Sequence, residues 1–130
     1  MNEQELIART KQCALRILKL VGALPKSVQG RAIAAQLVRS GTSVAANYRA
    51  ACKARSKAEF ISKLGTVEEE ADESAFWLEL IIEGESLSEN RARALLEEAC
   101  QLVAITAASR KTAAASLAKL AIGNRKSKIS

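Results

Sequence analysis

The sequence predicts an all-α protein, an antiparallel up-down four-helix bundle, on three observations. Hydrophobic residues make up 48% of the chain, many of them alanine, and aromatic residues only 3%, a mixture that suits helices better than strands. Pro25 is the only proline, so long uninterrupted helices can form. Apolar residues recur at helical spacing in four stretches joined by short polar loops, which is the pattern of such a bundle.

Local signals mark where the helices start and stop. Gly22 and Pro25 end the first helix, and Ser27 is the expected N-cap of the second. Ser56, with Glu59 three residues later, forms a capping-box pattern that starts the third. The expected ranges are 3–22, 28–52, 56–83 and, from Ser86 or Ser88, up to Leu120.

The chain is long enough for one domain with a buried core, and no repeat or linker divides it. We expect residues 1–122 to form the bundle and residues 123–130 to form a basic, flexible tail. Gly41, inside the second helix, indicates a kink or a close helix contact. Ser40 and Asn47 flank the apolar stripe there, and each predicts a hydrogen bond between helices that fixes their register.

The numbers of cysteine and histidine residues limit the metal and cofactor sites that this chain can form. Three cysteines lie far apart and the chain has no histidine, so we expect buried reduced thiols, no metal site and no cofactor. The N-terminal residues lack the pattern of a signal peptide, and no apolar run approaches the roughly 20 residues that span a bilayer. We therefore expect a cytoplasmic protein without a membrane partner. No residue set resembles a catalytic site or a phosphate-binding loop, which predicts a protein that is not an enzyme.

Charge is sorted into blocks along the chain, whose formal net charge is +6. Residues 1–63 hold 12 Lys and Arg against 3 Asp and Glu, and residues 64–100 hold 2 against 11. The remaining residues, 101–130, hold 6 Lys and Arg and no acid. Blocks of this kind on helices predict a polarised surface, suited in its basic part to phosphate groups.

The best candidates for a function lie at the end of the second helix and in the turn after it. Such side chains can contact phosphates by charge and shape, without reading bases. The alternative interpretation is a solvated face that neutralises the acids of the third helix. The candidate nucleic-acid-binding residues are Arg39, Arg49, Lys53, Arg55 and Lys57, with the basic tail as a further contact.

A second set of apolar residues lies away from the main stripes of the first and third helices. It is either part of a wide core-facing surface or a subunit interface, because exposed aromatic and leucine clusters usually meet a partner. A closed homo-oligomer would bury them. The candidate interface residues are Phe76, Trp77, Leu80, Leu15 and Leu18.

Three runs of residues carry a resemblance to a known family. They are RSGTSVAANYR at 39–49, SKAEFISKL at 56–64, and EEEADE at 68–73 followed by Phe76-Trp77-Leu78. In order and spacing they resemble the bacterial four-helix bundle proteins first described as reading frames in intervening sequences of 23S ribosomal RNA genes. The chain departs from many members at Arg49-Ala50-Ala51, where they carry an acid.

The resemblance implies an up-down bundle that assembles as a ring of five subunits and has no enzymatic activity. A related branch, the accessory protein of diversity-generating retroelements, is a basic pentameric barrel that binds nucleic acid and partners a reverse transcriptase. We therefore expect a homopentameric accessory protein that binds RNA or DNA by charge. The alternative is a ring that serves as a scaffold or adaptor for another protein, without a nucleic-acid function.

Overall fold

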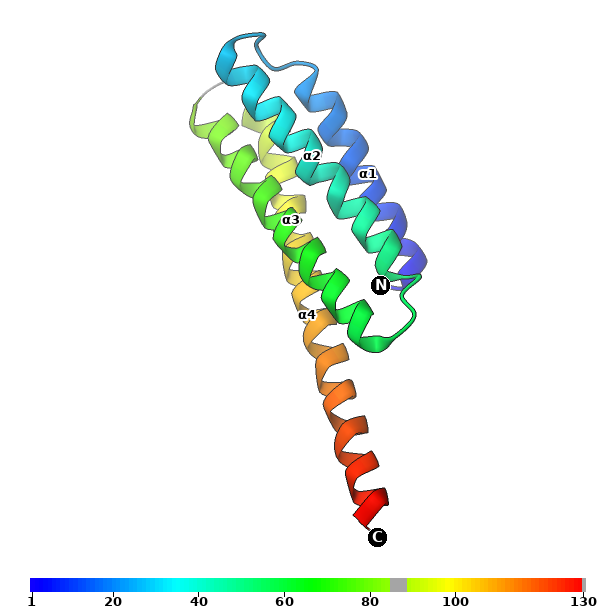
Figure 1. The fold of residues 1–130 in the computed structure, drawn as a ribbon. Helices are drawn as coiled ribbons and strands as arrows, with labels where there is room; N and C mark the ends of the chain where they lie inside the picture. The colour runs from blue at the N-terminus through cyan, green and yellow to red at the C-terminus, as the bar shows by residue number, and fades with distance from the viewer. Residues whose placement is uncertain (85–88, 130) are drawn as a thin grey trace.

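The chain folds into four helices that run alternately up and down in a bundle (Figure 1). This computed structural model describes residues 1–84 and 89–129, and the side chains of residues 1–84 and 90–125. The helices are α1 (Glu3–Val21), α2 (Val28–Ala51), α3 (Lys57–Glu83) and α4 (Glu89–Ile129). In the described part, α1 and α3 each pack against α2 and α4 but not against each other, which confirms the predicted four-helix bundle.

Side chains at the loops start the helices as predicted, with one difference. The Ser27 hydroxyl accepts a hydrogen bond of 3.1 Å from the backbone N–H of Gly30, and so caps α2. The Ser56 hydroxyl accepts one of 3.1 Å from the N–H of Glu59. The Glu59 carboxylate returns to the N–H of Arg55, not of Ser56, so the predicted capping box forms in one direction only. The predicted start of α4 at Ser86 or Ser88 lies outside the described residues.

The core lies along the bundle axis, where one stripe of each helix meets the others. Burial of each large aliphatic side chain contributes roughly 1.5–3 kcal/mol. Near the end of α3 the structure buries Ile81, whereas its neighbour Ile82 is half-buried. The large aliphatic side chains with essentially no exposure are Ile17, Leu20, Leu37, Leu64, Leu78, Ile81, Leu102 and Val67.

The polar residues Ser40 and Asn47 behave differently from each other. The Ser40 and Ser74 hydroxyl oxygens lie 2.8 Å apart, both buried, and hydrogen-bond α2 to α3. The prediction of a hydrogen bond between helices is therefore confirmed for Ser40. It is wrong for Asn47, whose amide donates to the backbone oxygen of Ser43 at 2.9 Å and to its hydroxyl at 2.8 Å, within α2. A half-buried amide on the flank of a helix reaches its own preceding turn first.

Gly41 marks a close contact between α1 and α2, one of the two alternatives that the sequence predicts. A Cβ atom at this position would lie 2.5 Å from Cδ1 of Ile17 and 3.2 Å from its Cγ2. The absence of a side chain thus lets the two helices approach.

We expect Gly41→Ala to lower the free energy of unfolding by about 1–2 kcal/mol, because overpacking costs more than alanine's helix propensity returns. Ile17→Val in the same chain should recover part of this loss, since it removes the atom nearest to the new methyl group. Gly65→Ala is the matched control on α3, because a Cβ there meets only an Arg110 side-chain carbon at 3.9 Å. Urea unfolding measures all three, and equal effects of Gly41→Ala and Gly65→Ala would refute the close contact.

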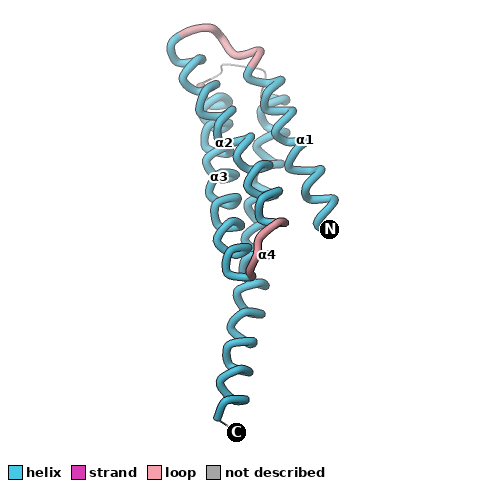
Figure 2. Tube along the Cα trace, turned by 45° about the vertical axis from the view of Figure 1, so that its right-hand side comes forward, coloured by secondary structure: helices cyan, strands magenta, loops and turns pink. Residues whose placement is uncertain are grey.

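α4 is longer than predicted. The sequence predicts an end at Leu120, but the helix continues to Ile129 and projects past the end of the bundle where α1 begins (Figures 1 and 2). Residues 118–125 are all exposed. Alanine, leucine and lysine are strong helix formers, and a single Gly123 costs only about 1 kcal/mol relative to alanine, so nothing local ends the helix. Residues 123–129 are thus helical, and the flexibility of this basic segment stays a prediction.

The three cysteines differ in burial, so the prediction of buried thiols holds only in part. Cys13 is buried, Cys52 is half-buried and Cys100 is exposed. Burial raises the pKa of the Cys13 thiol to about 11, and burial also raises the pKa of Cys52. The prediction fails for Cys100 because the number and spacing of cysteines do not show which side of a helix each one occupies, and Cys100 is exposed on α4.

The buried Cys13 thiol predicts a pH dependence of stability. In the unfolded chain Cys13 loses its proton near pH 9, whereas in the folded chain its pKa is about 11, so the unfolded state binds fewer protons between these values. The free energy of unfolding should therefore fall, by about 2–3 kcal/mol, as the pH rises from 9 to 11. Cys13→Ala should lack this part of the decline. Urea unfolding of the wild type and of Cys13→Ala at pH 8, 9.5 and 11 measures the fall in the free energy of unfolding. Parallel declines in the two proteins would contradict the role of Cys13.

Candidate nucleic-acid interface

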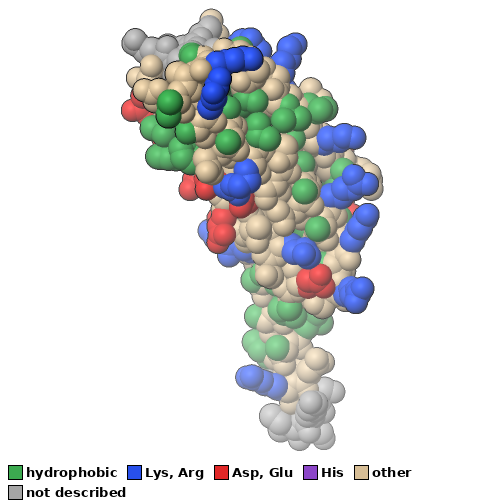
Figure 3. All heavy atoms as spheres, turned by 45° about the horizontal axis from the view of Figure 1, so that its top comes forward, with side chains coloured by type: hydrophobic (Ala, Val, Ile, Leu, Met, Phe, Trp, Pro, Cys, Tyr) green, Lys and Arg blue, Asp and Glu red, His purple; other side chains and the backbone are tan. Residues whose placement is uncertain are grey.

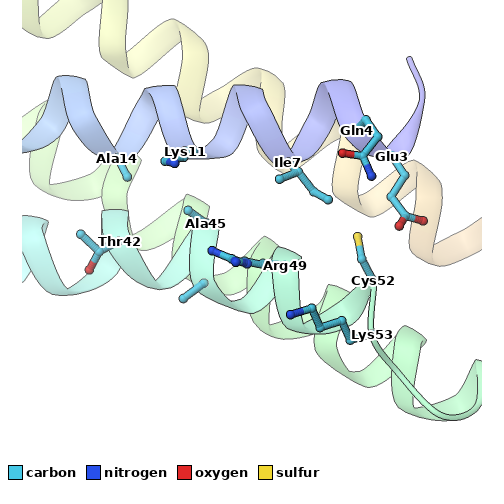
Figure 4. Close-up of a pocket in the computed structure, with 11 residues that line it drawn as sticks. Glu3, Gln4, Ile7, Lys11, Ala14, Thr42, Ala45, Arg49, Cys52 and Lys53 are labelled. Atoms are coloured by element: carbon cyan, nitrogen blue, oxygen red, sulfur yellow. The ribbon is translucent and has the colours of Figure 1, made fainter.

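A groove of about 660 Å³ runs between α1 and α2, along the N-terminal part of α1 and the C-terminal part of α2 (Figure 4). Small and apolar side chains form much of its lining, among them Ile7, Ala14 and Ala45. The antiparallel α1–α2 hairpin creates the groove, because it places the start of α1 beside the end of α2.

Three cations line this groove: Lys11 from α1, and Arg49 and Lys53 from the end of α2 and the turn after it (Figure 4). Arg49 lies in the last turn of α2 and Lys53 in the turn that follows, and both side chains line the groove. All three side chains are exposed, and none has an ion pair among the described residues. Glu3 is the one acid in the described lining, so the groove carries more positive than negative charge.

Arg39 lies elsewhere and is already neutralised. Its guanidinium Nη1 is 3.1 Å from Oε2 of Glu70, and its Nη2 contacts Glu73, so both partners come from α3. The alternative interpretation, a basic face that neutralises the third helix, is what the structure shows for this residue. Arg39 therefore belongs to the packing of α2 on α3 and does not lie in the groove with Arg49.

Arg55 and Lys57 lie at the turn between α2 and α3, beyond the end of the groove. The Lys57 ammonium donates a hydrogen bond of 2.8 Å to the hydroxyl of Ser116 on α4. Both side chains are exposed, but Lys57 is directed towards α4 and away from α1. The five candidate residues thus divide into three places, Arg39 on the α2–α3 contact, Arg55 and Lys57 at the α2–α3 turn, and Arg49 with Lys53 in the groove.

Sequence reasoning missed Lys11, the α1 residue of the groove. The signal that could have found it is the short loop between α1 and α2, which fixes the register of the antiparallel hairpin. The close contact of Ile17 with Gly41 shows that register. Lys11 lies six residues before Ile17 on α1, and Arg49 lies eight residues after Gly41 on α2. The register of the hairpin therefore brings both to the same groove.

Aromatic side chains are absent from the described lining of the groove. Tyr48, the nearest aromatic in sequence to Arg49, is buried in the core. Grooves that bind single strands usually carry aromatics on which bases stack. The arrangement here is suited to contact with phosphates along a duplex or a folded RNA.

Four of the five predicted interface residues are exposed in the described structure. Leu15 and Leu18 are exposed on α1, and Phe76 and Leu80 on α3. Trp77 differs, because it is half-buried and packs against the core. Its ring contacts Phe76 edge to face, with the centroids 5.1 Å apart. The alternative of a wide core-facing surface therefore fits Trp77 best among them.

Comparison with known proteins decides the family. The sequence profile of the 23S rRNA-intervening sequence proteins matches residues 2–108, most of the chain. The chain belongs to this family. The match covers the bundle up to the middle of α4, and the projecting part of α4 follows it. Membership confirms the resemblance of the motifs at 39–83.

A solved structure is similar over most of the chain. It is a protein with unknown function from the S23 ribosomal protein family of Bacteroides thetaiotaomicron, with 30% sequence identity and a TM-score of 0.75. The match covers 81% of this chain and 97% of that one. None of the curated proteins matches the chain. Among the described helices, none is both long and apolar enough to cross a membrane.

Proposed function

We propose that this member of the 23S rRNA-intervening sequence protein family is a non-enzymatic nucleic-acid-binding protein that works as a homo-oligomeric ring. The observation that supports the binding most is the position of Arg49 and Lys53 on one groove, exposed and without an ion pair among the described residues. The resemblance stated above supplies the expected number of subunits, five.

Charge is the reason to expect phosphates as the ligand. Arg49 and Lys53 lie on an open, exposed groove, where long side chains can adjust to a phosphate backbone. Neighbouring copies in a ring would present the same groove repeatedly, which multiplies the contacts to a long polyanion. The groove has no feature that reads base edges, so binding should be independent of sequence. Arg55, in the turn after Lys53, extends the basic surface.

The test is fluorescence anisotropy of the purified protein with a labelled duplex DNA and a labelled RNA hairpin. We expect binding to both, with log affinity falling linearly as log salt rises and a slope at least as steep as about −1.8, from the two contacts of Arg49 and Lys53 at about 0.9 each. An uncharged peptide of equal label and size is the control. Absence of binding at low salt would reject this function and favour the scaffold, whose signature is a specific protein partner retained after nuclease treatment.

A further inference from the structure

Two exposed strips on different helices each combine leucine or phenylalanine with charge of one sign. The α1 strip consists of Lys11, Leu15, Leu18 and Lys19, and the α3 strip consists of Asp72, Phe76, Leu80 and Glu83. All eight side chains are exposed. Along each strip consecutive members are three or four residues apart, except for the neighbours Leu18 and Lys19, so they lie along the outward side of the helix.

The two strips cannot cover each other within one chain. α1 packs against α2 and α4, and α3 packs against the same two helices, so α1 and α3 are at opposite corners of the bundle. Figure 3 shows the result on the face that it presents: basic side chains gather along one edge, and most acidic side chains along the other. Each strip is therefore available to a second molecule.

The strips are complementary in charge and in register. Leu18 and Leu80 each stand three residues before the last residue of their helices, Val21 and Glu83. Leu15 lies six residues before the end of α1, and Phe76 lies seven residues before the end of α3. Lys11 lies ten residues before the end of α1, and Asp72 lies eleven residues before the end of α3. α1 and α3 also run in the same direction in the bundle (Figure 1). Two strips set side by side in parallel would thus match leucine to leucine or phenylalanine and lysine to aspartate.

We propose that the α1 strip of one copy packs on the α3 strip of the next, in a parallel, head-to-tail contact. Apolar side chains at the centre and opposite charges at the rim are the pattern of a specific interface. Trp77 supports it from below, because its edge-to-face contact with Phe76 holds that ring on the surface. Such a contact uses two different surfaces of each molecule, so it repeats from copy to copy and ends only where a ring closes.

This inference rests on the oligomeric part of the proposed function, and a mixing experiment tests it. Variant one carries Leu15→Glu and Leu18→Glu, which place acids opposite the acidic α3 strip. Variant two carries Phe76→Ser and Leu80→Ser, which remove the apolar contact without adding charge. We expect each variant alone to be a monomer of 13.9 kDa by light scattering coupled to gel filtration. A one-to-one mixture should form a heterodimer of twice that mass, because one intact α1 strip and one intact α3 strip remain.

The outcomes separate the two proposals. A wild-type protein that is itself monomeric overturns the ring, and with it this contact. If the wild type is an oligomer and either variant keeps the oligomer's mass, the contact alone is overturned. A mixture that stays monomeric overturns it as well. One of these two results would also follow if a strip paired with the same strip of another copy. Circular dichroism checks that both variants fold.

Charge reversal gives a second readout without touching the apolar residues. Lys11→Asp should weaken self-association about fivefold, since it places an acid opposite Asp72. Adding Asp72→Lys to the same chain should restore the association to within about twofold. Unchanged association in the single variant, or no recovery in the double one, would overturn the register.

Discussion

Replacing Arg49 and Lys53 by glutamate should lower the affinity for nucleic acid about 100-fold at low salt. The two substitutions remove two phosphate contacts from the α1–α2 groove and place negative charge where the backbone would lie. Each substitution, with its lost contact and its new repulsion taken together, costs on the order of 1.4 kcal/mol, which is a factor of ten in affinity, so the two together give about 100-fold. Anisotropy with the labelled duplex and hairpin measures the effect.

A matched control separates local contact from overall charge. Lys26→Glu with Arg31→Glu changes the net charge by the same amount, and both residues are exposed at the opposite end of α2 from the groove. Eighteen residues of helix put Arg31 about 27 Å from Arg49 along the axis. We expect this control to lose less than about tenfold in affinity, through long-range charge alone. Equal losses in both variants would show that the groove is not the binding site.

The second large effect concerns the core. Leu64→Ala should lower the free energy of unfolding by about 2–5 kcal/mol, because it removes a side chain that is 0% exposed and leaves a cavity in close-packed surroundings. Leu64 lies on α3, which packs against both α2 and α4, so those neighbours cannot easily fill the space. Thermal or urea unfolding at one fixed protein concentration measures the loss, since association would otherwise shift the midpoint.

The control is the same substitution on the projecting part of α4. Leu120 is 57% exposed, so Leu120→Ala should change the free energy of unfolding by less than about 0.5 kcal/mol. If Leu120→Ala proved as costly as Leu64→Ala, the projecting segment would be buried in the assembled protein. In that case the bundle of one chain would not be the whole cooperative unit.

Helix periodicity and capping residues predicted the bundle well, because both act locally. The stripe through Leu64 and Leu78 needs only the 3.6-residue repeat, and Ser27 needs only the N–H groups of its own helix. The predicted end of α4 was wrong for a related reason, because no proline follows Leu120 and Gly123 alone costs only about 1 kcal/mol relative to alanine.

The candidate site was harder to predict, because it depends on which helices become neighbours. Five basic residues close in sequence separate once α2 meets α3: Arg39 pairs with Glu70 and Glu73, and Lys57 bonds to Ser116. Lys11 joins Arg49 from almost forty positions away, through the register of the α1–α2 hairpin. Periodicity gives the face of a helix on which a charge lies but not the charge that it will meet.

The central claim is that the α1–α2 groove is a phosphate-binding surface, and the salt dependence of binding tests it most directly. The affinity of the wild-type protein and of the Arg49→Glu, Lys53→Glu variant for the duplex should be measured from 50 to 300 mM salt. We predict that the slope of log affinity against log salt is shallower in the variant by about 1.8, the contribution of two phosphate contacts. Parallel slopes, or a wild-type protein that does not bind at the lowest salt, would contradict the claim.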